Sequence, residues 1–204
     1  MANVKEKMIK KLGTPVMVTY LDGTTKETKS LITKAGYFNS SMIAMEAHRK
    51  CDFVIADNVT GGCIVENLVT GEIYLTVALY PASYKDKFLS TVFRALVVNA
   101  TLTTSRNVEV ADDRGRITKE PQVIIENLPV YIMAASQELR QYNPGLHLDA
   151  EYVIYMPKSD VSVLDKIIVT GEFGDELILK SVSNPDILTY QGVSILEAKT
   201  ETRG

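Results

Sequence analysis

The sequence of 204 residues has no tryptophan, two histidines and only two cysteines, Cys51 and Cys63. A secreted domain that depends on disulfides carries more cysteines, so the pattern favours two reduced thiols in a reducing compartment, although the spacing would permit one bridge. The N-terminal segment has lysines without an apolar run behind them, which does not fit a secretory signal. No segment reaches a membrane-spanning length without charges, so we expect a cytoplasmically made protein with no membrane contact.

A strong excess of either charge is also lacking. The formal net charge is -3, and no long run of basic residues occurs. Proteins that grip nucleic acid by its phosphates need a basic patch, so this chain is a poor candidate for such binding, and we also expect no sequence-specific recognition of DNA. A weakly acidic wall still suits a channel through which DNA moves. The hydrophobic content of 46% excludes a wholly disordered chain and is enough for one core or two small ones.

The sequence does contain many short segments of β character. Residues 15–21 form a predicted strand, Asp22-Gly23 a hairpin turn and residues 24–33 the return strand. Residues 73–80 form the clearest strand, which Pro81 is expected to end. Residues 83–99 fit a helix or a strand. Further strands are predicted at 52–56, 63–67, 123–125, 130–133, 151–156, 166–170, 176–182 and 192–198. This pattern predicts a mainly β protein of small barrel or sandwich modules.

Short helices are predicted near the N-terminus and at residues 134–142. In the first, Val4, Met8, Ile9 and Leu12 fall near one face and Gly13 suits its end. This helix either packs on the body or docks on a neighbouring subunit. The expected organisation is an N-terminal helix or arm at 1–13, a β-rich domain at 14–103, a linker or exposed loop at 104–120, a small β-barrel domain at 121–198 and a loose tail at 199–204.

One cluster resembles metal ligands. It comprises His48 and Cys51, with Cys63 and Asp52 or Asp57 nearby, while the other histidine, His147, is far away in sequence. A structural zinc site uses four nitrogen or sulfur ligands, often in close pairs, and only three are present locally. We therefore expect core cysteines and a surface histidine, with no metal and no cofactor.

Catalytic signatures are also missing. Asp112-Asp113 are paired carboxylates, but Arg114 and Arg116 neutralise them locally, and such a loop suits a subunit interface. Gly61-Gly62 lacks the lysine and helix start of a phosphate cradle. We expect no catalytic residue and therefore no enzyme. The competing hypothesis is an enzyme with an unfamiliar site that uses His48, Cys51 or the Asp112-Asp113 pair.

The last quarter of the chain has a characteristic order of segments. Residues 152–158 are followed by Asp160-Val161 and by residues 164–167, then by a glycine turn, residues 177–182 and a closing strand at 192–196. This run, an aspartate, a hydrophobic strand, a glycine turn and a second hydrophobic strand, resembles the β-barrel module of head-closure (stopper) proteins in the necks of tailed bacteriophages.

The resemblance implies a structural virion protein of the head-to-tail interface, assembled in the host cytoplasm. Identical subunits would form a homo-oligomeric ring that retains packaged DNA, contacts portal or adaptor proteins and docks the tail. Polar loops at 39–49 and 112–119 are candidates for inter-subunit contacts or a gate. Alternatives are a tail-terminator, tail-completion or baseplate adaptor ring, or a ligand-binding β-domain with aromatics in one cleft, although the ten tyrosines are scattered.

Overall fold

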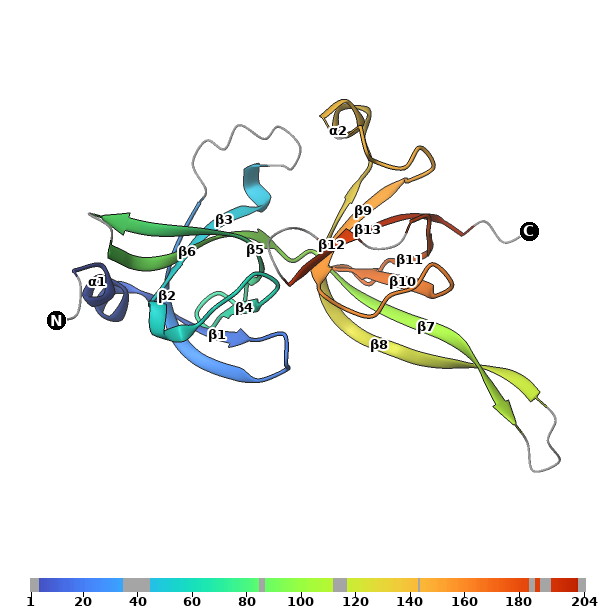
Figure 1. Cartoon of the computed structure of the whole chain (residues 1–204), viewed down its shortest axis with the longest axis horizontal. Coiled ribbons are helices and arrows are strands. Elements are labelled where there is room, and N and C mark those ends of the chain that lie inside the picture. The colour runs from blue at the N-terminus through green and yellow to red at the C-terminus, as the bar shows by residue number, and fades with distance from the viewer. Residues whose placement is uncertain are drawn as a thin grey trace. The chain divides into compact units, whose positions relative to one another are not determined.

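The structure is a computed structural model that describes residues 4–34, 45–84, 87–111, 117–142, 144–183, 186–187 and 192–201. Within these ranges the chain forms thirteen strands, two short α-helices and two 3-10 turns (Figure 1). The predicted mainly β fold class, with barrel modules and few short helices, is confirmed. Neither described helix is long and apolar enough to cross a membrane.

The chain divides into two compact units, each assembled from several segments. Unit 1 comprises Met1–Val98, Met156–Lys158 and Ile187–Ser194, and unit 2 comprises Asn99–Tyr155, Ser159–Asp186 and Ile195–Gly204. The first boundary therefore lies before the predicted linker at 104–120, which falls largely within two long strands of unit 2. The segment is polar because its strands are exposed. Strand residues that no other layer covers are polar, as loop residues are.

Unit 1 contains a closed six-stranded barrel in the order β1-β2-β3-β6-β5-β4, closed by the antiparallel pairing of β1 with β4. Its strands are β1 (Thr14–Thr19), β2 (Thr25–Lys34), β3 (His48–Phe53), β4 (Ile64–Asn67), β5 (Ile73–Tyr84) and β6 (Lys87–Val97). The predicted Asp22-Gly23 turn joins β1 to β2, and Asp22 Oδ1 accepts a hydrogen bond from the Thr24 amide at 2.9 Å.

Alternating residues of these strands fill the barrel, as expected when successive side chains point to opposite faces. Val16 and Val18 on β1 are fully buried. Phe53 and Phe93 meet edge to face with ring centroids 6.0 Å apart. Cys51, Cys63, Val65 and Tyr74 belong to the same core cluster. The core explains why the apolar positions of the first hundred residues follow a period of two.

Two sequence predictions for unit 1 need correction or resolution. The described part of the ambiguous segment 83–99 contains the end of β5 and strand β6 (Lys87–Val97), and no helix. Pro81 does not end β5, because the strand continues to Tyr84 and Pro81 pairs with Thr91 on β6. The pairing of β4 with β5 covers only Ile73–Leu75. Pro81 lies beyond this pairing, where a missing backbone N–H interrupts no ladder between β4 and β5.

The predicted N-terminal helix is α1 (Val4–Leu12), which lies against the barrel of unit 1. Ile9 is fully buried, and the Gly13 amide donates to the Ile9 carbonyl at 2.8 Å where the helix ends. Of the four apolar residues that the sequence places near one face, only Ile9 is buried. Val4 and Leu12 are 78% and 65% exposed, and Met8 is exposed as well.

The second sheet has seven strands in the order β11-β10-β7-β8-β9-β13-β12, with an additional pairing of β11 with β13, and most of its residues belong to unit 2. Because that pairing joins strands distant in the order, the sheet curls back on itself. Its elements are β7 (Ala100–Ala111), β8 (Ile117–Ala134), α2 (Gln137–Tyr142), β9 (Tyr152–Pro157), β10 (Lys166–Gly171), β11 (Glu176–Ser181), β12 (Asp186–Ile187) and β13 (Val193–Thr200).

The core of unit 2 comes from both halves of its sequence. Leu102 on β7, Ile154 on β9, Ile167 on β10 and Leu196 on β13 are all fully buried. The predicted strands after residue 150 match β9, β10, β11 and β13 closely. The predicted loose tail at 199–204 begins too early, since β13 runs to Thr200 and the Thr200 amide donates to Glu151 Oε2 at 3.0 Å.

Candidate assembly surface

The residues that the sequence singled out for metal binding do not gather around one point. Cys51 and Cys63 are free, fully buried members of the unit 1 core. His48 is buried on β3 beside Arg94 of β6, whose Nη2 lies 2.9 Å from His48 Nε2, so the prediction of a surface histidine is wrong. Among the described residues, no group of three or more His, Cys, Asp and Glu side chains is placed to hold a metal ion.

Both aspartates of that sequence cluster are used in ion pairs within unit 1. Lys5 Nζ on α1 lies 2.9 Å from Asp52 Oδ2, and Lys26 Nζ lies 2.9 Å from Asp57 Oδ1. Thr28 also donates its hydroxyl to Asp57 Oδ2 at 2.7 Å. These contacts fasten α1 and the 3-10 turn at Ile55–Asp57 to the barrel. The two carboxylates therefore stabilise the fold. The sequence alone had left open that they bind a metal.

The thiol of Cys51 has a chemical state set by its burial. Burial, and then the negative charge of Asp52, raise the pKa of the Cys51 thiol to about 12, against the smaller opposing effect of Arg49. A nucleophilic or metal-binding cysteine needs an accessible thiolate. Cys51 is thus placed as a small core residue, and its side chain offers no nucleophile at neutral pH.

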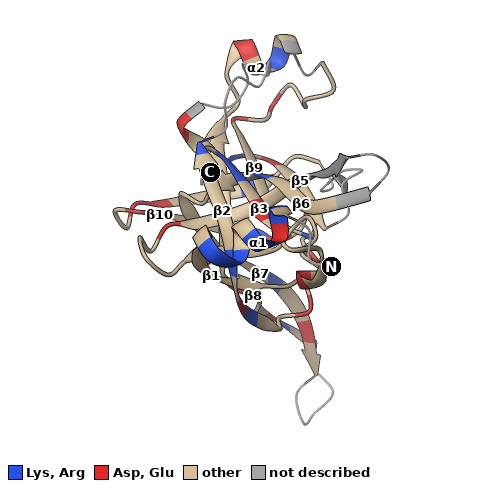
Figure 2. Cartoon of the chain, turned by 90° about the vertical axis from the view of Figure 1, so that its left-hand side faces the viewer, with Lys and Arg blue, Asp and Glu red and all other residues tan. Residues whose placement is uncertain are grey.

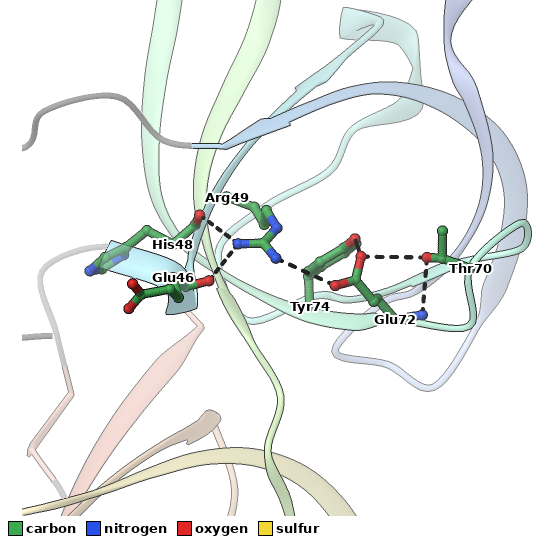
Figure 3. A network of polar contacts seen from close by, with 6 residues as sticks. All are labelled: Glu46, His48, Arg49, Thr70, Glu72 and Tyr74. Carbon is green, nitrogen blue, oxygen red and sulfur yellow. Dashed lines mark hydrogen bonds and ion pairs between the residues drawn. The ribbon is translucent and has the colours of Figure 1, made fainter. Parts of the chain in front are cut away.

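The candidate loop at 39–49 is only partly within the described residues. Residues 39–44 lie outside them, whereas Met45–Ala47 form a 3-10 turn and His48 begins β3. Arg49 holds this end of the segment, because its Nη1 donates to the Glu46 carbonyl at 2.5 Å and to the His48 carbonyl at 3.1 Å (Figure 3).

The same arginine reaches across to the turn that precedes β5. Arg49 Nη2 lies 3.4 Å from Glu72 Oε1, and the Tyr74 hydroxyl donates to Glu72 Oε2 at 2.8 Å (Figure 3). The Tyr74 hydrogen bond, together with Arg49, holds the pKa of Glu72 below its ordinary value against its partial burial. This network fixes the start of β3 against the turn before β5, so this end of the candidate loop has a structural role in the barrel.

The second candidate loop, 112–119, lies between the exposed ends of two long strands, β7 and β8. Asp112 to Arg116, including the paired carboxylates, lie outside the described residues. On either side, β7 and β8 extend well beyond the other strands of their sheet (Figure 1). β10 pairs with β7 only over residues 100–105, and β9 pairs with β8 only over residues 131–134. We call residues 106–111 and 117–129, which lack these neighbours, the arm. Residues 106–111 and 117–122 pair only with each other, whereas residues 123–129 pair with residues 101–105 of β7, which also pair with β10.

The arm exposes apolar side chains along its length. Ile117 and Val123 are 67% and 56% exposed, and Val110 is exposed as well. By their register, Ile117, Pro121 and Val123 lie on one face of the ribbon, since alternate residues share a face. A two-stranded ribbon is only marginally stable in water unless another surface covers it. The arm therefore has the properties of a surface that packs against another molecule.

Several features of the arm limit unselective strand addition at its edges. Pro121 and Pro129 on β8 lack the backbone N–H that a further strand would need. The pairing of β7 with β8 shifts register around Thr104, and Asn127 has a left-handed φ of 51°. The Asn127 amide donates to the Thr103 hydroxyl at 3.2 Å, which holds this irregular segment. Such bulges twist a ribbon and interrupt the hydrogen-bonding edge. A partner must therefore bind mainly through contacts with the side chains of the ribbon.

The base of the arm is fixed by an ion pair between a partly exposed arginine and a buried carboxylate. Arg106 Nε lies 2.6 Å from Asp165 Oδ1, and its Nη2 donates to Asp165 Oδ2 at 3.0 Å. The Asp165 side chain is fully buried and also accepts the Ser162 amide at 2.8 Å. A two-point contact between guanidinium and carboxylate fixes direction as well as distance. It ties the segment before β10 to the point where the arm leaves the sheet.

The chain matches no known protein family and no curated protein. The sequence predicted a linker or exposed loop at residues 104–120 because they are polar, and a strand at residues 123–125. The available signal was the alternation of Val108 and Val110 with polar residues. Alternation of this kind indicates a half-buried strand.

Proposed function

We propose that this chain is a structural virion protein of the head-to-tail interface of a tailed bacteriophage. Identical copies form a ring that retains packaged DNA in the head, contacts portal or adaptor proteins and presents a docking surface to the tail. The observation that carries the proposal is the arm, a two-stranded ribbon with exposed apolar residues that needs a covering partner. The order of segments after residue 150, which resembles the module of stopper proteins, supports the proposed position at the head-to-tail interface.

A ring requires that the arm of each subunit packs on a different surface of the next subunit. Each copy has one arm, and a contact between the arm of one subunit and a different surface of the next is heterologous. Repeated heterologous contacts close into rings when the rotation between neighbours permits it. The irregular, proline-bearing edge of the arm opposes open-ended strand addition. Selective side-chain packing is what a defined ring requires.

The weak negative charge of the chain fits a channel for DNA. With a net charge of -3, the protein has little general attraction for phosphates. DNA held behind such a ring can leave without first being released from a high-affinity site. The proposed action depends on shape, symmetry and movement, and no chemical step is part of it.

The first test is the mass of the purified full-length protein by analytical ultracentrifugation, with negative-stain images of the same sample. The proposal expects rings on concentration or on addition of DNA-filled, tailless heads. Those heads should then protect their DNA from nuclease. A protein that stays monomeric under both conditions and leaves the DNA accessible contradicts the proposal.

Labelling of assembled virus particles with an antibody against the chain locates the ring. Signal at the head-to-tail junction supports the proposed position. Signal at the distal end of the tail favours a baseplate adaptor, and signal on free tails that lack heads favours a tail-terminator or tail-completion ring. These alternatives share the ring and differ in its place.

A further inference from the structure

The turn between β10 and β11 projects an aromatic side chain into solvent. Phe173 is 91% exposed, which makes it the most exposed large apolar side chain among the described residues. Single exposed apolar residues are common on protein surfaces, so this exposure needs support from its surroundings. Aromatic side chains are enriched where proteins bind one another, and Phe173 is therefore a candidate anchor if its support is rigid.

The support of Phe173 is a short hairpin with fixed ends. The Gly171 amide donates to the Asp175 carbonyl at 2.8 Å, and the Gly174 amide donates to the Gly171 carbonyl at 3.0 Å. Strands β10 and β11 pair directly beside this turn. The backbone that carries Phe173 thus has little conformational entropy to lose when a partner binds.

Negative charge surrounds the phenyl ring. Glu172 and Asp175 lie within two residues of Phe173, at most about 7 Å along the chain, which is less than the screening length of about 8 Å at physiological salt. Glu176 follows at the start of β11. Among the described residues, no basic group lies within ion-pair distance of these three carboxylates. We call residues 172–176 the knob, and its partner must be apolar with positive charge beside it.

Unit 1 has a groove of this character, bounded by α1, β2 and the 3-10 turn at Ile55–Asp57. Its volume is about 350 Å³. A cavity of about 150 Å³ holds a benzene ring, so the groove has room for a phenyl group. Two lining side chains are buried and apolar, Ile9 and Val54, and Ala56 beside them is exposed.

The groove is also lined by two lysines. Lys10 is paired with Glu6 at 2.7 Å, but α1 carries four lysines and one glutamate and stays positive; Figure 2 shows basic positions along it. Lys29 on β2 donates to the Lys10 carbonyl at 3.1 Å, and no carboxylate of the described residues lies within ion-pair distance of it. The one acid in the lining, Asp57, is paired with Lys26 at 2.9 Å. The groove therefore offers apolar surface with positive charge.

We infer that the knob of one copy inserts Phe173 into the groove of a second copy. Two knobs together would set carboxylates against carboxylates, and two grooves would set lysines against lysines. The knob in the groove joins unlike charges and covers the exposed ring. Because the two halves lie on different surfaces of each chain, the contact is heterologous, which is the kind that closes a ring. This contact acts beside that of the arm, deepens the proposed function and rests on it for the ring.

Removal of the phenyl ring tests the contact without changing any charge. Phe173→Ala is expected to weaken assembly at least about tenfold, because a few aromatic anchors contribute most of the affinity of an interface. Leu148→Ala is the matched control, since Leu148 is 88% exposed on the same unit and lies outside the knob. It should assemble as the unaltered protein does. Analytical ultracentrifugation over a series of concentrations measures both.

Charge reversal identifies the surface that receives the knob. Lys10→Glu/Lys29→Glu makes the groove acidic, and Glu172→Lys/Asp175→Lys makes the knob basic. Each variant alone is expected to assemble at least about tenfold less tightly, because like charges then meet at every contact. An equimolar mixture should regain assembly, with both variants in one particle by native mass spectrometry. A chain that carries all four substitutions should assemble by itself.

Matched controls place the same charge changes elsewhere. Lys34→Glu/Lys158→Glu on unit 1 and Glu138→Lys/Glu201→Lys on unit 2 alter exposed residues outside the groove and the knob. Both should assemble as the unaltered protein does. Circular dichroism of each variant establishes folding. A charge-reversed variant that fails to fold is replaced by one with glutamine or asparagine at the same positions.

The outcomes separate the knob–groove contact from the proposed function. Rings that persist in Phe173→Ala and in both charge-reversed variants overturn the contact and leave the proposed function intact. Loss of assembly in the single variants without recovery on mixing also overturns the contact. An unaltered protein that never assembles overturns both.

Discussion

Gly62 and Gly192 approach each other so closely that neither position has room for a side chain. A β-carbon on Gly62 would lie 1.9 Å from the Gly192 carbonyl oxygen, and one on Gly192 would lie 2.1 Å from the Gly61 carbonyl oxygen. Both glycines have positive φ, 82° and 104°. The Gly61-Gly62 pair, which lacks the features of a phosphate cradle, thus has a structural reason: the C-terminal segment of unit 1 packs directly on this turn.

Gly62→Ala is expected to destabilise unit 1 by more than about 3 kcal/mol, because the methyl group meets backbone and the left-handed φ is strained as well. Gly71→Ala is the matched control. Gly71 also has a positive φ, 74°, but an added β-carbon would meet nothing within 4 Å. Its expected cost is about 1 kcal/mol, from backbone strain alone. Urea unfolding monitored by circular dichroism compares the two, and equal losses would refute the close approach.

Loss of the Arg106–Asp165 pair is expected to destabilise the folded protein, although Arg106 is partly exposed. Arg106→Met leaves the fully buried Asp165 carboxylate without its cation and is expected to lower the free energy of unfolding, by less than in a fully buried pair because the arginine side is partly exposed to solvent. Arg106→Lys keeps the charge and loses the two-point contact, so its cost should be smaller. Denaturant unfolding at pH 7 measures both. Similar losses in the two variants would show that the charge of residue 106 is unimportant.

The same pair predicts an acid sensitivity. Burial acts to raise the pKa of Asp165, but hydrogen bonds from Arg106 and the Ser162 amide, with the charge of Arg106, outweigh it and lower the pKa. A carboxyl with a lowered folded-state pKa contributes stability above its unfolded pKa of about 3.9, and that contribution is lost as pH falls through the folded-state value. The stability difference from Asp165→Asn should therefore be constant from pH 7 to about 5 and shrink below about 4. A constant difference down to pH 2 would contradict this.

The two cysteines are expected to resist thiol reagents in the native protein. Both side chains are fully buried, and the pKa of Cys51 is raised to about 12 by burial. At pH 8, native protein should react with iodoacetamide at least about a hundred times more slowly than protein unfolded in urea. Peptide mass spectrometry assigns each modification. Rapid labelling of Cys51 without denaturant would revive the hypothesis of a reactive cysteine.

Removal of the arm should separate folding from assembly. Arg106 and Gln122 are paired across the ribbon, so an Asn-Gly turn can join them in place of residues 107–121. The described side chains among those removed are mostly exposed, and the expected change in the free energy of unfolding is below about 1 kcal/mol. Analytical ultracentrifugation should show loss of assembly. A shortened protein that still forms rings would exclude the arm as the assembly surface.

Local sequence patterns were sufficient to predict much of the secondary structure of this protein. A period of two in the apolar residues predicted most strands, because strand side chains alternate between faces. Asp22-Gly23 was identifiable as a turn from positive φ and a side-chain acceptor. Gly13 correctly marked the end of the N-terminal helix. Each of these signals depends on a few neighbouring residues, and the sequence contains them in full.

Tertiary structure decided what covers each element. The apolar residues of α1 predicted an amphipathic helix, yet contacts of Ile9 and Lys5 with the barrel turned Val4, Met8 and Leu12 outward. Pro81 could remain within β5 because β4 pairs only with the start of that strand. The polar segment after residue 104 became an arm because β10 and β9 pair only with its base. Pairing between distant segments sets these outcomes, and no local pattern encodes which strand ends first.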